Sequence, residues 1–137
     1  MFVQIFLTIG ASILGLLGVV HLVFTFFSNR FEPCDGSVAQ AMRQTNPVIS
    51  RETTMWDAWV GFNASHSLGA IMFAAFYIPL ALFNLPVITQ SLWFTLLPVM
   101  VGLAYLALAK RYWFSVPFNG IFMATICFII AAVLAVF

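Results

Sequence analysis

The most constraining feature of this sequence is a set of four apolar runs, each about long enough to cross a lipid bilayer. A membrane-spanning helix needs about 20 mostly apolar residues, and the runs cover residues 2–27, 56–83, 91–109 and 117–137. Only 7% of the residues are charged and 64% are hydrophobic, whereas an ordinary soluble domain carries about 25% charged residues. The sequence therefore predicts an all-α fold, a four-transmembrane-helix bundle that forms a single integral membrane domain over residues 1–137.

The loop between the first two runs, residues 28–55, is the hydrophilic part of the chain. Residues 37–45 have the pattern of a short amphipathic helix, with apolar side chains on one side and a basic one on the other. Thr54 and Asp57 then have the spacing of a helix N-terminal cap. This spacing predicts that the second long helix begins at about residue 56.

Charge is distributed unevenly between the two sides of the expected bundle. Four spans place the loops 28–55 and 110–117 on the same side, and these loops contain all of the basic residues: Arg30, Arg43, Arg51, Lys110 and Arg111. The positive-inside rule predicts that this side is cytoplasmic and that both termini are outside. The net charge of +1 gives no basis for nucleic-acid binding.

The second run contains two stripes of uncommon residues. Trp59, Asn63 and His66 follow one another at spacings of four and three residues, which places them on one face of a helix. A second stripe has the small-xxx-small pattern that lets two membrane helices approach closely, and it consists of Gly61, Ser65 and Gly69. We expect the first stripe to be a polar face and the second to pack against a helix.

The first run carries a matching polar face that includes His21 and Thr25. In an antiparallel pair of helices, His21 and His66 would lie at similar depth near the charged side, and polar groups inside a membrane usually face other helices or a cavity. The sequence therefore predicts a polar cavity between the first two spans. Its candidate residues are His21, Thr25, Trp59, Asn63, His66 and Ser67.

The polar face admits several interpretations. The side chains can form hydrogen bonds that join the two helices, or they can line a cavity for a small ligand. His21 and His66 could be the two axial ligands of a haem in an electron-transfer protein. Alternatively, His66 could be the general base of an enzyme that acts on a lipid-like substrate, with Asn63 beside it and Asp57 or Glu52 at the mouth of the cavity.

Other chemistry is poorly supported by the sequence. Two histidines are too few for a zinc site, and the carboxylates lie outside the apolar runs, so we expect no metal site. Cys34 and Cys127 should lie at different depths, which argues against a disulfide. We expect a non-enzymatic protein, either an accessory membrane subunit or a small-ligand-binding protein. Its partners would be the lipid bilayer and other membrane subunits or further copies of the chain.

Two motifs resemble the signature of a known family. They are residues 51–56, with the sequence RETTMW, and residues 61–69, with the sequence GFNASHSLG. They are similar to motifs of an uncharacterised family of small bacterial four-span integral membrane proteins, as are the Gly18-x-x-His21 pair and the turn at residues 31–33. The resemblance covers most of the chain and is densest over residues 24–70. It implies a four-helix membrane fold of bacterial origin, and it implies no activity, cofactor or site residue. We expect the protein to lie in a bacterial inner membrane.

Overall fold

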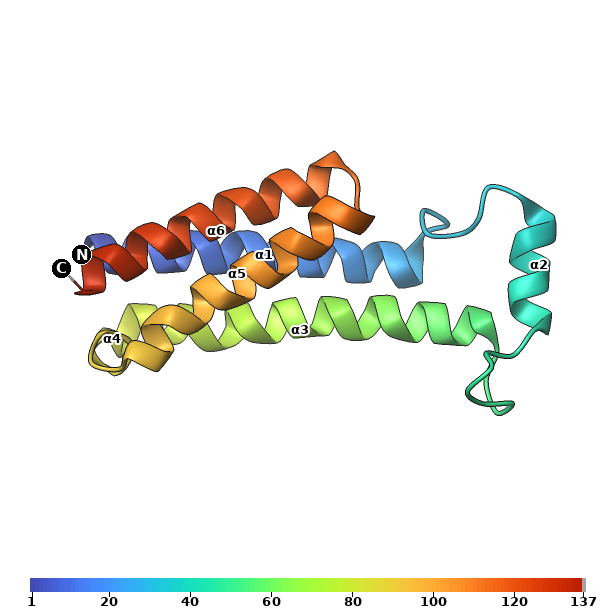
Figure 1. The fold of residues 1–137 in the computed structure, drawn as a ribbon, viewed down its shortest axis with the longest axis horizontal. Helices are drawn as coiled ribbons and strands as arrows, with labels where there is room; N and C mark the ends of the chain where they lie inside the picture. Colours follow the sequence, from blue (N-terminus) through green and yellow to red (C-terminus); the bar gives the residue numbers. More distant parts are fainter. Residues whose placement is uncertain (137) are drawn as a thin grey trace. The chain divides into compact units, whose positions relative to one another are not determined.

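The computed structural model describes residues 1–136, and over this range the chain forms six helices and no strand (Figure 1). Four of the helices are long and apolar enough to cross a membrane: α1 (Phe2–Phe27), α3 (Met55–Phe83), α5 (Leu92–Tyr112) and α6 (Ser115–Val136). Each of them exposes large apolar side chains, such as Leu16, Phe62, Leu103 and Met123. The prediction of an all-α fold is confirmed, and the chain is a small integral membrane protein.

The bounds of α1 are as expected, and the other observed helix ends differ from the expected ones by at most three residues. The largest difference is at the end of α5, which continues through Lys110 and Arg111 to Tyr112. Basic side chains in the last turn of a helix interact favourably with its dipole, so they do not end it. α6 begins before Pro117, because a proline in the first turn loses no helical hydrogen bond. The expected end at Phe137 lies outside the described residues.

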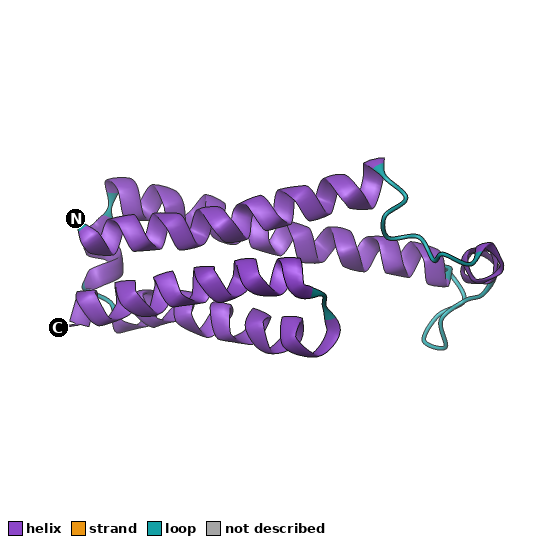
Figure 2. Cartoon of the chain, turned by 90° about the horizontal axis from the view of Figure 1, so that it is seen from above, coloured by secondary structure: helices purple, strands orange, loops and turns teal. Residues whose placement is uncertain are grey.

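Two short helices complete the chain. α2 (Gly36–Gln44) occupies nearly the stretch in which an amphipathic helix is expected, and Asp35 caps it by accepting a hydrogen bond from the Ser37 backbone N–H at 2.8 Å. α4 (Leu85–Thr89) is a single turn between α3 and α5. In Figure 2, most of the non-helical chain lies on either side of α2.

The chain divides into two compact units. The larger unit contains residues 1–17 and the chain from residue 70 onward, and the smaller unit contains residues 18–69. Each of the helices α1 and α3 therefore contributes one end to each unit.

In the larger unit, parts of the four long helices pack closely through small residues. A Cβ atom added at Gly10 of α1 would lie 2.6 Å from the ring of Phe128 in α6. A Cβ atom added at Gly102 of α5 would lie 2.8 Å from the Thr125 hydroxyl, also in α6. These two glycines let the helix backbones approach one another where any larger residue would meet a side chain.

Aromatic residues fill the centre of the larger unit. The rings of Phe73 and Tyr77 in α3 stack at 4.7 Å, and Phe73 also meets Phe128 edge-on at 5.7 Å. The buried Tyr77 hydroxyl donates a hydrogen bond to the Phe94 carbonyl of α5 at 3.1 Å. α3 is thus held to both α5 and α6 by the same group of rings.

In the smaller unit, the ends of α1 and α3 are joined by the loop that contains α2. The Asn46 amide donates hydrogen bonds to the carbonyls of Arg51 and Thr53, at 3.3 and 2.7 Å, and so closes the segment between α2 and α3. The Thr54 hydroxyl then caps α3: it accepts from the Asp57 N–H at 3.1 Å and donates to the Asp57 carboxylate at 2.8 Å. The cap is the one that the spacing of these residues predicts.

Candidate functional site

The smaller unit contains a hydrogen-bonded polar cluster that joins α1 to α3. His21 Nε2 and Asn63 Oδ1 are 2.9 Å apart. The Asn63 amide also donates to the Trp59 carbonyl at 2.8 Å. The hydroxyls of Thr25 and Ser67 each donate at 2.8 Å to the carbonyl four residues earlier, which belongs to His21 and Asn63 respectively. The structure thus brings together five of the six predicted cavity residues.

The sixth residue, His66, lies beside His21. The two imidazole rings are 5.5 Å apart between centroids and meet edge-on at 67°. The His21 ring also lies 4.4 Å from the Phe31 ring of the loop. The facing arrangement of the two histidines, which was inferred from their depth, is therefore present in the structure.

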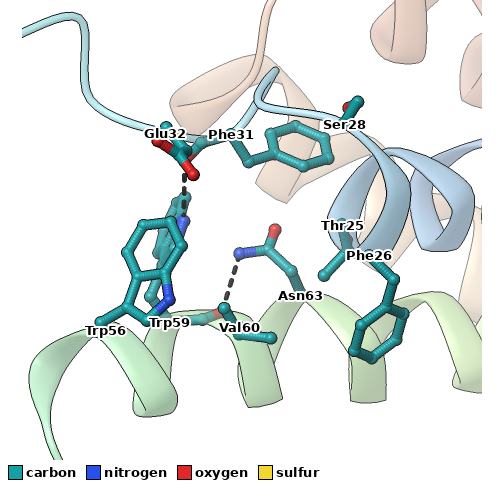
Figure 3. A pocket seen from close by; sticks show the side chains of 9 residues that line it. All are labelled: Thr25, Phe26, Ser28, Phe31, Glu32, Trp56, Trp59, Val60 and Asn63. Carbon is teal, nitrogen blue, oxygen red and sulfur yellow. Dashed lines mark hydrogen bonds between the residues drawn. The ribbon is translucent and has the colours of Figure 1, made fainter. Parts of the chain in front are cut away.

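A pocket of about 280 Å³ lies next to this cluster, and we call it the interfacial pocket. Nine residues line it: Thr25, Phe26, Ser28, Phe31, Glu32, Trp56, Trp59, Val60 and Asn63. Figure 3 shows the side chains of Trp56, Trp59 and Asn63 rising from α3 toward Phe31 and Glu32 of the loop. Among the described residues, neither histidine lines this pocket. The interfacial pocket is therefore bordered by residues of the polar loop and not by the histidine pair.

The loop contributes a wall of the pocket that sequence reasoning missed. The Trp59 indole N–H donates to the Phe31 carbonyl at 3.1 Å, which fixes the loop over the start of α3. A second, more open hollow of about 430 Å³ shares Phe31, Glu32 and Trp59 with the interfacial pocket. The only sequence signal for this wall was the turn at residues 31–33, which belonged to the family resemblance and had no assigned role.

Arg43 of α2 holds the acidic side chain of the pocket. Its guanidinium Nη2 lies 3.2 Å from Glu32 Oε1, and its Cζ atom lies 4.5 Å from the centroid of the Trp56 ring. The side chains of Arg43 and Glu32 are 46% and 41% exposed. An ion pair this open to solvent contributes about 0–1 kcal/mol, so it can be exchanged for another contact at little cost.

The loop also contains a carboxylate whose ionised form is favoured. The pKa of Asp35 lies below its ordinary value because the Ser37 side chain donates a hydrogen bond to the carboxylate, and the backbone N–H of Ser37 donates a second. Asp35 therefore stays charged at neutral pH and keeps its role as the cap of α2.

The remaining candidates are placed as follows. Gly61, Ser65 and Gly69 are all exposed, and a Cβ atom added at Gly61 would have no neighbour within 4 Å. The packing of another helix against this stripe stays a prediction. Asp57 is engaged in the cap of α3, and Cys34 and Cys127 are both free thiols. Within residues 1–136, no group of three His, Cys, Asp or Glu side chains is placed to hold a metal ion.

Comparison of the chain with protein-family models gives no match, and comparisons with curated proteins and with solved structures give none either.

Proposed function

We propose that this membrane protein is a small-ligand-binding protein that takes the polar end of an amphipathic molecule into the interfacial pocket. The carrying observation is the composition of that pocket, in which four aromatic rings are combined with a carboxylate, two hydroxyls and an amide. Small-molecule sites characteristically combine apolar walls with a few polar groups that fix orientation. A volume of about 280 Å³ suits a single small polar group.

The lengths of the helices support a site at the membrane surface. α3 has 29 residues, which at about 1.5 Å per residue makes a helix of about 43 Å, whereas the hydrocarbon core is about 30 Å thick. Arg51 and Glu52 lie just before the Met55 end of α3 and Asp57 just after it, so the excess length of the helix belongs at that end. Trp56 and Trp59 then lie among the lipid headgroups, the depth at which tryptophan is enriched.

The orientation and location belong to the same proposal. The basic residues of the two loops favour a cytoplasmic position for the pocket. The resemblance of residues 51–56 and 61–69 to a family of bacterial four-span proteins favours the bacterial inner membrane. A ligand would enter the pocket from the inner leaflet or from the cytoplasm. The exposed stripe at Gly61, Ser65 and Gly69 leaves a face on which another subunit or a second copy could pack.

The proposal is tested by filling the pocket. Val60→Trp places a large ring in the pocket wall, and Val48→Trp, the matched control, places the same ring on a fully exposed loop position. Molecules that remain bound to protein extracted in a mild detergent are identified by mass spectrometry. We expect one class of molecule to remain bound to the wild type and to Val48→Trp and to be lost from Val60→Trp at an unchanged melting temperature. Equal occupancy of all three proteins would contradict the proposal.

Haem binding is the second candidate, and it is favoured by the closeness of the two imidazole rings, at 5.5 Å. His21 and His66 would hold the iron, and the haem would supply electron transfer. Ligation through His21 Nε2 would replace the bond to Asn63. A visible absorption spectrum of the purified protein tests this candidate: haem binding through the two histidines requires a Soret band that is lost in His66→Ala, and a spectrum without the band would eliminate haem.

A further inference from the structure

The hydrogen-bonding groups of the interfacial pocket are mainly acceptors. The hydroxyl protons of Thr25 and Ser28 are donated to backbone carbonyls one turn earlier in α1, both at 2.8 Å. The Ser28 oxygen also accepts from the Arg30 N–H at 3.3 Å, and each hydroxyl oxygen still has a lone pair left to accept with. The Trp59 N–H is donated to the loop. Asn63 retains one N–H beyond the bond it donates to α3, and the Trp56 indole N–H is a second donor. The acceptor positions on Glu32, Thr25 and Ser28 outnumber these two donors, so a ligand that supplies donors complements the pocket.

The charge and the rings of the pocket point to a cation. Glu32 is the single charged side chain among the nine described residues that line it. Four of the others are aromatic: Phe26, Phe31, Trp56 and Trp59. A carboxylate beside aromatic faces is the combination that binds ammonium groups, because the cation is attracted both by the negative charge and by the electron-rich face of each ring.

The chain itself shows that a cation is accepted here. The Arg43 guanidinium lies 3.2 Å from the Glu32 carboxylate and 4.5 Å from the Trp56 ring centroid, so it engages both kinds of partner at once. Arg43 comes from α2 and does not line the pocket, and its side chain is nearly half exposed. It therefore occupies the two partners from outside the pocket and leaves the remaining wall open.

We propose that the ligand of the interfacial pocket carries an ammonium group, which binds Glu32 and the aromatic rings in competition with Arg43. This inference rests on the proposed function and names its ligand class. The ammonium group can belong to the headgroup of an aminophospholipid, whose acyl chains would stay in the bilayer, or to a free organic amine. In either case the charge of Glu32 is needed for binding, and Arg43 weakens it.

The experiment uses the full chain in nanodiscs made of phosphatidylglycerol, with tryptophan fluorescence as the readout, since Trp56 and Trp59 line the pocket. Three probes are titrated: ethanolamine, a short-chain phosphatidylethanolamine and a short-chain phosphatidylglycerol. We expect a saturable change with an ammonium probe that is absent in Val60→Trp. Binding of ethanolamine alone identifies a free amine as the ligand, and binding of only the phosphatidylethanolamine identifies a lipid headgroup.

Variants then test the named contacts. Glu32→Gln removes the charge with little change of shape, and we expect it to weaken binding of the ammonium probe at least tenfold. Glu52→Gln is the matched control in the same loop, and it should bind as the wild type does. Arg43→Gln removes the internal competitor, and we expect it to bind the probe more tightly than the wild type.

The possible results separate this inference from the proposed function. If phosphatidylglycerol binds as well as the ammonium probes and Val60→Trp abolishes both signals, the pocket binds a ligand but the ammonium assignment is overturned. The assignment is also overturned if Glu32→Gln binds like Glu52→Gln, or if Arg43→Gln weakens binding. If Val60→Trp alters the response to none of the probes, the ammonium assignment fails. The proposed function is then decided independently, by the mass spectrometry of the molecules that remain bound to the extracted protein.

Discussion

Two glycine-to-alanine substitutions should change the stability of this protein in opposite directions. Gly10 and Gly61 both lie inside long helices. At Gly10, the added Cβ atom would lie 2.6 Å from the Phe128 ring and 3.1 Å from the Ala124 carbonyl oxygen. At Gly61, nothing lies within 4 Å of it. The same methyl group is therefore forced into a packed contact at one position and meets open space at the other.

Two contributions set the change in the free energy of unfolding. Alanine is favoured over glycine inside a helix by about 1 kcal/mol, and this gain is shared by both substitutions. Overpacking of a filled contact costs about 1–3 kcal/mol, and Phe128 cannot move aside easily because it is 1% exposed and packs against Phe73. We expect Gly61→Ala to stabilise the protein by up to about 1 kcal/mol. The free energy of unfolding of Gly10→Ala should be lower than that of Gly61→Ala by about 1–3 kcal/mol.

The assay is reversible unfolding in mixed micelles with increasing sodium dodecyl sulfate, followed by far-UV circular dichroism. The difference between the two variants isolates the packing contribution, because the helix-propensity gain cancels. A Gly10→Ala protein at least as stable as Gly61→Ala would refute the packing of α1 against α6. If Gly61→Ala is destabilised only at high protein concentration, the exposed stripe instead packs against a second copy.

Three further predictions concern the smaller unit. A double-mutant cycle with His21→Ala and Asn63→Ala should give a coupling energy of about 0.6 kcal/mol and at most about 1.7 kcal/mol, the range for hydrogen bonds between membrane helices; zero coupling in micelles would contradict their bond. The pKa of Asp35 is lowered from its ordinary value of 3.8, so its contribution to stability is present above pH 3.8 and is lost as the pH falls through the lower folded value; Ser37→Ala should raise this pKa in a carboxyl NMR titration, and an unchanged pKa would count against the cap. Cys34 is exposed, so a membrane-impermeant maleimide should label it in inside-out vesicles but not in intact cells; labelling of intact cells would reverse the orientation.

The fold class could be predicted from the sequence because its evidence is local. The hydropathy of a run is the sum of its own residues, and a run such as residues 2–27 needs no distant partner to indicate a span. The cap formed by Thr54 and Asp57 was predictable for the same reason, since both groups lie within one turn. The ends of α5 and α6 were less well predicted, because charged residues and proline are tolerated near helix ends.

The polar cluster was predicted only in part. Helical periodicity placed Asn63 and His66 on one face, and similar depth paired them with His21, with which Asn63 shares a hydrogen bond. The loop wall was beyond the reach of periodicity. Phe31 and Trp59 are 28 residues apart, and their bond depends on the path of an irregular segment. The position of Arg43 between Glu32 and Trp56 depends on the same path.

The sequence by itself determined that the chain spans a membrane with four helices and that polar groups gather at one end of α1 and α3. Only the tertiary structure decided which small residues face another helix. Gly10 and Gly102 meet α6, whereas Gly61, which fits the small-xxx-small pattern, faces open space. The physical reason is that lipid is as apolar as the protein interior, so hydrophobic periodicity does not distinguish the packed face of a membrane helix from its lipid face. That distinction is set by contacts between distant helices, and so is the wall of the interfacial pocket.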